Sequence, residues 1–134
     1  MFQYPLAALV TLLSLFVLFW MAMQVGKARG KYEVKAPKHD GPDDFLRVLR
    51  VYENTQEMLM LFLPSLWIFA LTISDMWAGI IGIFFPIGRL VYARGYYKAA
   101  DQRTMGFQIG FIPTCILLIG AVLGALHAAY AIYS

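Results

Sequence analysis

The sequence predicts an all-α integral membrane protein, a four-helix bundle that forms a single domain over residues 1–134. Hydrophobic residues make up 60% of the chain, and they concentrate in four long segments. Each segment reaches the roughly 20 residues that a helix needs to cross the hydrocarbon core. The expected spans are about residues 4–24, 45–73, 76–100 and 105–132.

We expect residues 4–24 to be a retained first span, although their position resembles that of a signal peptide. No basic residue precedes the apolar stretch, whereas a signal peptide begins with a basic region. Trp20, Met21 and Met23 near its end do not resemble the small residues of a cleavage site. The first apolar segment is therefore counted as one of the four helices.

The connections between the spans differ in length. Residues 27–44 form the one long polar loop, which ends in Pro42 and Asp43, residues that suit the first turn of a helix. The connection over residues 72–76 is short, so the second and third spans should form an antiparallel hairpin. Pro86 and its neighbouring glycines allow a kink in the third span.

The basic residues predict how the bundle lies in the membrane. Five follow the first span, and Arg94, Lys98 and Arg103 follow the third, while Asp75 is the only loop charge on the opposite side. Because cytoplasmic loops carry the excess of Lys and Arg, both termini should lie outside and the charged loops in the cytoplasm. The net charge of +3 therefore points to lipid headgroups around the spans, and no nucleic-acid partner is expected.

Polar side chains recur on the second and third spans at steps of three, four and seven residues. Residues at these steps share one face of a helix, and charges at membrane depth usually line an internal site. The two stripes should therefore face a common pocket near the cytoplasmic surface. The stripes comprise Arg47, Arg50, Asn54 and Glu57 on the second span, and Arg89, Tyr92, Tyr96 and Arg103 on the third.

Two interpretations of these stripes remain open from the residues alone. Glu57 and Arg89 could form an ion pair that only joins the helices. However, Arg29, Arg50 and Arg103 exceed what one intramembrane carboxylate can neutralise, which favours an additional anion. A zwitterionic, peptide-like ligand fits, because Arg binds carboxylates, Glu binds ammonium, and Asn and Tyr bind peptide groups.

The sequence predicts no metal site. Cys115 is the one cysteine, and its place within the fourth span is typical of a buried, inert thiol. His127 has no metal-binding residue spaced with it, so a packing or interfacial role is expected.

Two motifs resemble the family of membrane-associated proteins in eicosanoid and glutathione metabolism (MAPEG). Residues 41–57 contain the pattern R-x-x-x-N-x-x-E, formed by Arg50, Asn54 and Glu57. Residues 89–96, the run RLVYARGY, are followed by Arg103. With the chain length and the four spans, this resemblance covers essentially the whole protein.

The resemblance implies a homotrimeric enzyme that binds glutathione between subunits and takes a lipophilic electrophile or lipid hydroperoxide from the bilayer. By matching position, Arg103 is the catalytic residue that activates the glutathione sulfur, since a nearby guanidinium favours the nucleophilic thiolate. The implied glutathione contacts are Arg29, which would reach across the subunit interface, and Arg50, Asn54, Glu57, Tyr92 and Tyr96.

Some positions depart from the leukotriene-forming branch of the family. Met58 stands where that branch has a tyrosine, and Tyr52 replaces a glutamine. Gly30 stands where that branch has an arginine, and the neighbouring Lys31 could take the place of this arginine. These departures favour a general glutathione transferase or peroxidase. The charged, proline-containing loop resembles bacterial members, so we expect a bacterial inner membrane.

Two other functions are compatible with a small four-span protein. A non-enzymatic, lipid-binding scaffold of the same family is the main alternative, and retention of Arg103 argues against it. A small multidrug transporter also has four spans, but it needs a carboxylate in the first span, and residues 1–26 contain none.

Overall fold

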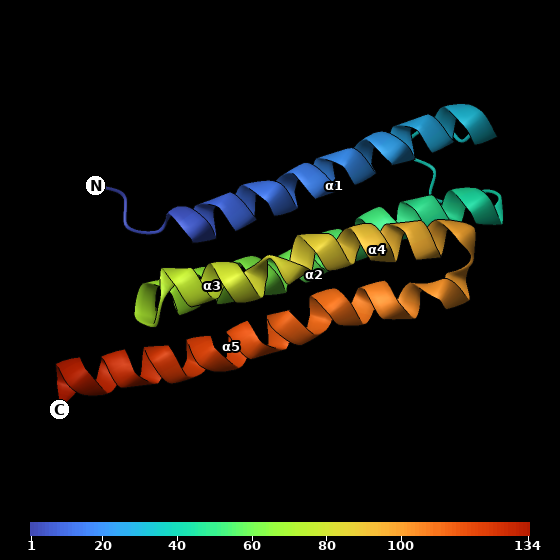
Figure 1. Cartoon of the computed structure of the whole chain (residues 1–134). Helices are drawn as coiled ribbons and strands as arrows, with labels where there is room; N and C mark the ends of the chain where they lie inside the picture. Colours follow the sequence, from blue (N-terminus) through green and yellow to red (C-terminus); the bar gives the residue numbers. More distant parts are fainter.

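Four helical rods lie side by side in the computed structural model, which describes the whole chain of 134 residues (Figure 1). Three rods are continuous: α1 (Pro5–Tyr32), α2 (Asp43–Thr72) and α5 (Thr104–Tyr133). The remaining rod consists of α3 (Asp75–Gly82) and α4 (Phe84–Lys98). All four rods are long and apolar enough to cross a membrane, which confirms the predicted all-α, four-span architecture.

The rod formed by α3 and α4 is interrupted at Ile83. Pro86 explains the interruption, because proline has no N–H and its ring clashes with the carbonyl four residues earlier, that of Gly82. The helix is thus interrupted in the span where the sequence allows a kink. Pro64 and Pro113 lie inside α2 and α5, and both helices continue past them.

Helix α1 is longer than the sequence predicts. It continues to Tyr32, and Glu33 ends it in a left-handed conformation with φ of 57°. The expected loop over residues 27–44 is therefore wrong at its start, and the connection begins only after the helix. The fall in hydropathy shows where the apolar span ends, but it does not end the helix. The helix continues because basic residues such as Arg29 and Lys31 are favourable in its last turn.

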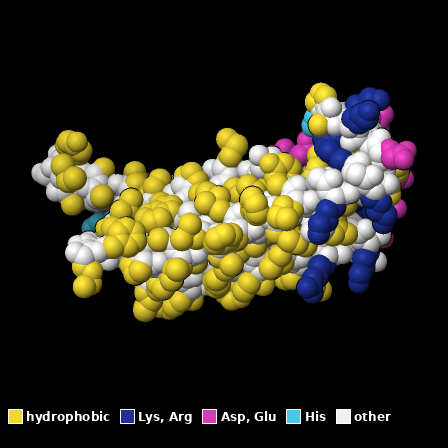
Figure 2. All heavy atoms as spheres, turned by 90° about the horizontal axis from the view of Figure 1, so that it is seen from above, with side chains coloured by type: hydrophobic (Ala, Val, Ile, Leu, Met, Phe, Trp, Pro, Cys, Tyr) yellow, Lys and Arg dark blue, Asp and Glu magenta, His cyan; other side chains and the backbone are white.

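Charged side chains collect at one end of the bundle, which we call the charged end (Figure 2). It contains residues 33–42, which join α1 to α2, and the 3₁₀ turn η1 (Ala100–Arg103) between α4 and α5. Both chain termini lie at the opposite, terminal end (Figure 1). Exposed apolar side chains such as Phe16 and Ile119 cover the length between the two ends, as a surface in contact with lipid requires.

Glycines bring α4 and α5 into close contact near the charged end. A Cβ atom added to Gly106 would lie 2.0 Å from the backbone nitrogen of Tyr92, and one on Gly88 would lie 2.5 Å from that of Gly110. Small residues allow helix backbones to approach in this way within membranes. The contact at Gly106 holds Tyr92 of α4 beside the first turn of α5.

Candidate functional site

A pocket of about 370 Å³ lies at the charged end between α2, α4 and the start of α5. Its volume falls within the range of about 300–1,000 Å³ that is typical of small-molecule sites. Five of the seven residues that the sequence predicts for the site line it. The lining residues are Arg50, Asn54, Tyr92, Tyr96, Arg103, Thr104 and Phe107.

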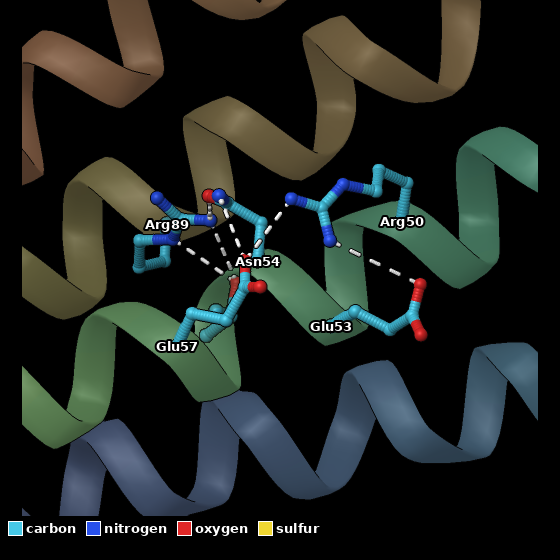
Figure 3. Close-up of polar contacts among 6 residues, drawn as sticks. Arg50, Glu53, Asn54, Glu57 and Arg89 are labelled. Atoms are coloured by element: carbon cyan, nitrogen blue, oxygen red, sulfur yellow. Dashed lines mark hydrogen bonds and ion pairs between the residues drawn. The ribbon is translucent and has the colours of Figure 1, made fainter.

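Arg50 and Glu57 form an ion pair on α2 (Figure 3), and of the two only Arg50 lines the pocket. Nη2 of Arg50 lies 3.0 Å from Oε1 of Glu57, and the two side chains are 44% and 60% exposed. Asn54 Nδ2 donates a longer hydrogen bond of 3.5 Å to the same oxygen. Exposed ion pairs contribute little to stability, so both charged groups are free to exchange partners with a ligand.

Arg89 lies behind this pair, inside the bundle, with 1% of its surface exposed. Its Nε donates to Thr55 Oγ1 at 3.0 Å, and its Nη2 donates to Asn54 Oδ1 at 2.8 Å. Its guanidinium also lies 3.9 Å from the ring centre of Tyr92. The ion-pair interpretation of Glu57 and Arg89 is therefore wrong, because Arg89 points inward and Glu57 outward. Arg89 instead fixes the amide of Asn54.

The two tyrosines of α4 form the wall opposite α2. Tyr92 and Tyr96 pack edge to face with ring centres 5.5 Å apart. Phe107 of α5 extends this wall, at 6.4 Å from Tyr92. The guanidinium of Arg103 lies 5.6 Å from the ring centre of Tyr96, where a cation and an aromatic face attract each other.

Arg103 reaches this position by a different route from the one its spacing suggests. The expected helical stripe would continue from Tyr96 to Arg103, but α4 ends at Lys98 and Ala99 is extended, with φ of −162° and ψ of 145°. The helical part of the prediction is therefore wrong for Arg103. The turn η1 folds back over Gly95, where an added Cβ would lie 2.2 Å from the carbonyl oxygen of Gln102, and this close approach returns Arg103 to the pocket.

Arg29 does not reach the pocket within one chain. Its Nη1 donates to the carbonyl of Lys38 at 2.7 Å and to that of Val34 at 3.4 Å, and its guanidinium lies 5.4 Å from the ring centre of Phe45. Lys31 likewise lies away from the pocket, with its ammonium 5.3 Å from the ring centre of Tyr32. The role of Arg29 across a subunit interface stays a prediction.

A second hollow of about 430 Å³ adjoins the pocket and shares Arg50 and Tyr96 with it. His39, from the connection between α1 and α2, lies on its border with Nδ1 3.8 Å from Oε2 of Glu53. The pocket therefore lies next to the solvent-exposed loops of the charged end.

Sequence reasoning missed three residues of this region. Thr104 and Phe107 look like ordinary members of an apolar span, and only the close packing of α4 on α5 brings them to the pocket. Thr55 follows Asn54 directly, but it lies on the buried face of α2, where it accepts hydrogen bonds from Arg89. Its position beside a polar stripe was the only available signal.

The arrangement combines the groups needed to bind a zwitterion and to stabilise an anion. The guanidinium groups of Arg50 and Arg103 suit carboxylate or thiolate groups, Glu57 suits an ammonium group, and Asn54 and the tyrosines suit amides. No group of three or more His, Cys, Asp or Glu side chains is close enough to hold a metal ion.

Known proteins resemble this chain over nearly its whole length. The sequence model of the MAPEG family matches residues 7–123. Human microsomal glutathione S-transferase 2 is 36% identical over 124 residues, which cover 92% of this chain and 82% of that protein. Rat leukotriene C4 synthase is 33% identical over 121 residues, or 90% and 81% of the two chains. An uncharacterized protein of Synechocystis is 44% identical over 119 residues, or 89% and 87%.

Proposed function

Because the chain belongs to the MAPEG family, we propose that it is a membrane-bound enzyme that uses glutathione to conjugate lipophilic electrophiles or to reduce lipid hydroperoxides. The observation that carries the proposal is the pocket that gathers Arg50, Asn54, Tyr92, Tyr96 and Arg103 at the charged end. Relatives named as a glutathione S-transferase and as leukotriene C4 synthase support glutathione as the co-substrate.

Glutathione matches the inventory of the pocket group by group. Its carboxylates would pair with Arg50, its ammonium group with Glu57, and its amides with Asn54 and the hydroxyl groups of Tyr92 and Tyr96. The pair between Arg50 and Glu57 would open when the ligand supplies a new partner to each side chain. Since Arg89 holds the Asn54 oxygen, the Asn54 amino group is the part left for the ligand.

Arg103 would favour the thiolate form of the bound glutathione. A free thiol has a pKa of about 8.5, and a nearby positive charge lowers it. Because a guanidinium stays protonated, Arg103 would act electrostatically, and the thiol proton would leave to water. The thiolate then attacks an electrophilic carbon and displaces its leaving group. With a hydroperoxide, it takes up one oxygen and releases the alcohol; a second glutathione then yields the disulfide and water.

We further propose that the enzyme is a homotrimer in a bacterial inner membrane, with its termini outside and its charged end in the cytoplasm. The high exposure of Arg50 and Glu57 supports a site that a neighbouring subunit completes. Arg29, which is held near the α1–α2 connection, would then contact the ligand of the neighbour. The concentration of Lys and Arg at one end supports the orientation, and the Synechocystis relative supports a bacterial source.

The proposal is tested with purified protein, glutathione and either a chlorodinitrobenzene or a lipid hydroperoxide. We expect saturable glutathione binding and turnover of at least one of the two substrates. Lipid binding without turnover would indicate the non-enzymatic scaffold. The absence of both glutathione binding and turnover would refute the proposed function.

A further inference from the structure

Two basic side chains of α4, Arg94 and Lys98, have no partner of opposite charge within the chain. Every ion pair of the protein involves α2 instead. Both side chains are exposed, and no acidic residue occurs between Asp75 and Asp101. Lys and Arg side chains border the apolar surface at the charged end (Figure 2). The positive charge of this part of α4 is therefore available to an anion from outside the protein.

Arg94 and Lys98 face away from the glutathione pocket. Each stands two residues after a tyrosine of the pocket, Tyr92 or Tyr96. A helix turns by about 100° per residue, so two steps carry a side chain roughly 200° around it, to the opposite side of α4. Neither residue lines the pocket or the adjoining hollow. The two cations therefore belong to a separate, outward surface.

This outward face of α4 changes from apolar to basic along its length. Ile87, Val91, Arg94 and Lys98 follow one another at steps of four, three and four residues, so they share one face of the helix. Ile87 and Val91 are 45% and 36% exposed. A molecule that lies along this face meets apolar side chains first and two cations at its end.

The cations lie at the depth of lipid headgroups. The rod begins at Asp75, and a rise of 1.5 Å per residue places Arg94 roughly 28 Å and Lys98 roughly 34 Å from that end. The hydrocarbon core is about 30 Å thick, so both lie near its cytoplasmic boundary. Tyr97 packs there against Trp20 of α1, with ring centres 6.2 Å apart. Trp and Tyr are enriched at this level of the membrane.

We propose that the outward face of α4 binds an anionic phospholipid. Arg94 and Lys98 hold its negatively charged headgroup, and its acyl chains lie along Ile87 and Val91. An anionic phospholipid matches both parts of the face, because a soluble anion leaves the apolar part uncovered and a zwitterionic lipid brings no net charge. The inference goes beyond the proposed function, and either can fail while the other stands.

The experiment measures the preference of the protein for phosphatidylglycerol over phosphatidylcholine, by native mass spectrometry from micelles that contain both lipids. Arg94→Gln/Lys98→Gln is compared with Lys35→Gln/Lys38→Gln, which removes the same charge from the exposed connection between α1 and α2. We expect the unmodified protein and the loop variant to prefer phosphatidylglycerol. The α4 variant should lose roughly 25-fold of this preference, since a basic residue near an anionic lipid surface strengthens binding roughly fivefold.

Three results would overturn the inference. They are equal losses in the two variants, no loss in the α4 variant, and no preference in the unmodified protein. Excess inorganic phosphate should leave the lipid bound, and displacement would contradict a lipid as the occupant. Arg94→Lys/Lys98→Arg keeps both charges and should keep the preference. Thermal unfolding in detergent shows that each variant is folded.

Discussion

The two ends of the bundle are built from the same helices, but their polar groups differ in how they are paired. At the terminal end, the interior is apolar, with Phe62 and Phe85 stacked at 4.1 Å. One interhelical polar contact there is that of Asp75, whose carboxylate accepts hydrogen bonds from the backbone nitrogens of Leu6 and Ala7 at 3.1 and 2.9 Å. Every polar group in that contact has a fixed partner, so this end is suited to holding the helices together.

At the charged end, some polar groups are fixed and others are free. Arg89, Thr55 and Asn54 form an interior cluster with fixed partners. In front of it, Arg50 and Glu57 are exposed and able to exchange partners. The buried cluster therefore supports the site, while the exposed groups and the amino group of Asn54 form the ligand-binding part. Substitutions should therefore change activity at the charged end and stability at the terminal end.

The largest expected effect on activity is that of Arg103→Ala. Removing a positive charge that stabilises the reacting anion should lower kcat on the order of 10²–10³-fold, as loss of a comparable donor does in other enzymes. Glutathione binding should weaken much less. The control is Arg94→Ala, because Arg94 is an exposed arginine of α4 outside the pocket. Steady-state kinetics with an unchanged kcat for Arg103→Ala would remove Arg103 from the chemistry.

At the terminal end, Phe62→Ala should produce the opposite pattern. Phe62 is fully buried, so the cavity should cost about 3 kcal/mol of unfolding free energy. The Kd of glutathione should stay the same, because the substitution lies outside the pocket. Thermal or denaturant unfolding in detergent measures the first quantity, and calorimetric titration the second. A large change in Kd would show that the two ends are coupled.

A smaller effect is expected for Glu57→Gln. The amide keeps the shape of the side chain but loses the charge proposed to bind the ammonium group, so the Kd of glutathione should rise about tenfold. Glu53→Gln is a matched control on the same helix, since Glu53 also faces Arg50, at 4.0 Å, but borders the adjoining hollow and makes no hydrogen bond to Asn54, whereas Glu57 does. Equal effects of the two substitutions would indicate a general change in charge and no specific contact.

The smallest effect is expected for Asp75→Ala. The substitution removes the acceptor for two backbone nitrogens at the start of α1, a loss comparable to that of a helix cap, about 1 kcal/mol. Unfolding should occur at slightly lower temperature, and turnover should be unchanged. Loss of activity at full stability would contradict the assignment of the terminal end to a purely structural role.

The sequence predicts the parts of this molecule that follow from spacing along a single helix. Arg50, Asn54 and Glu57 share one face of α2, and Tyr92 and Tyr96 share one face of α4, as their steps of three and four residues require. The four apolar spans follow in the same way from length and composition.

The remaining features depend on contacts between elements. Ala99 and Ala100 are good helix formers, so nothing in the sequence indicates that the helix stops there and that Arg103 returns through η1. Phe107 joins the pocket only because Gly106 allows α5 to approach Tyr92. Such close approaches are decided by the packing of whole helices, which spacing along one helix does not contain.

The proposed glutathione site is tested most directly by a structure of the protein solved with glutathione bound in a membrane-like environment. We expect the tripeptide in the pocket between α2, α4 and the start of α5, with its sulfur beside Arg103 and its ammonium group at Glu57. Glutathione bound elsewhere, with these side chains turned toward lipid, would contradict it.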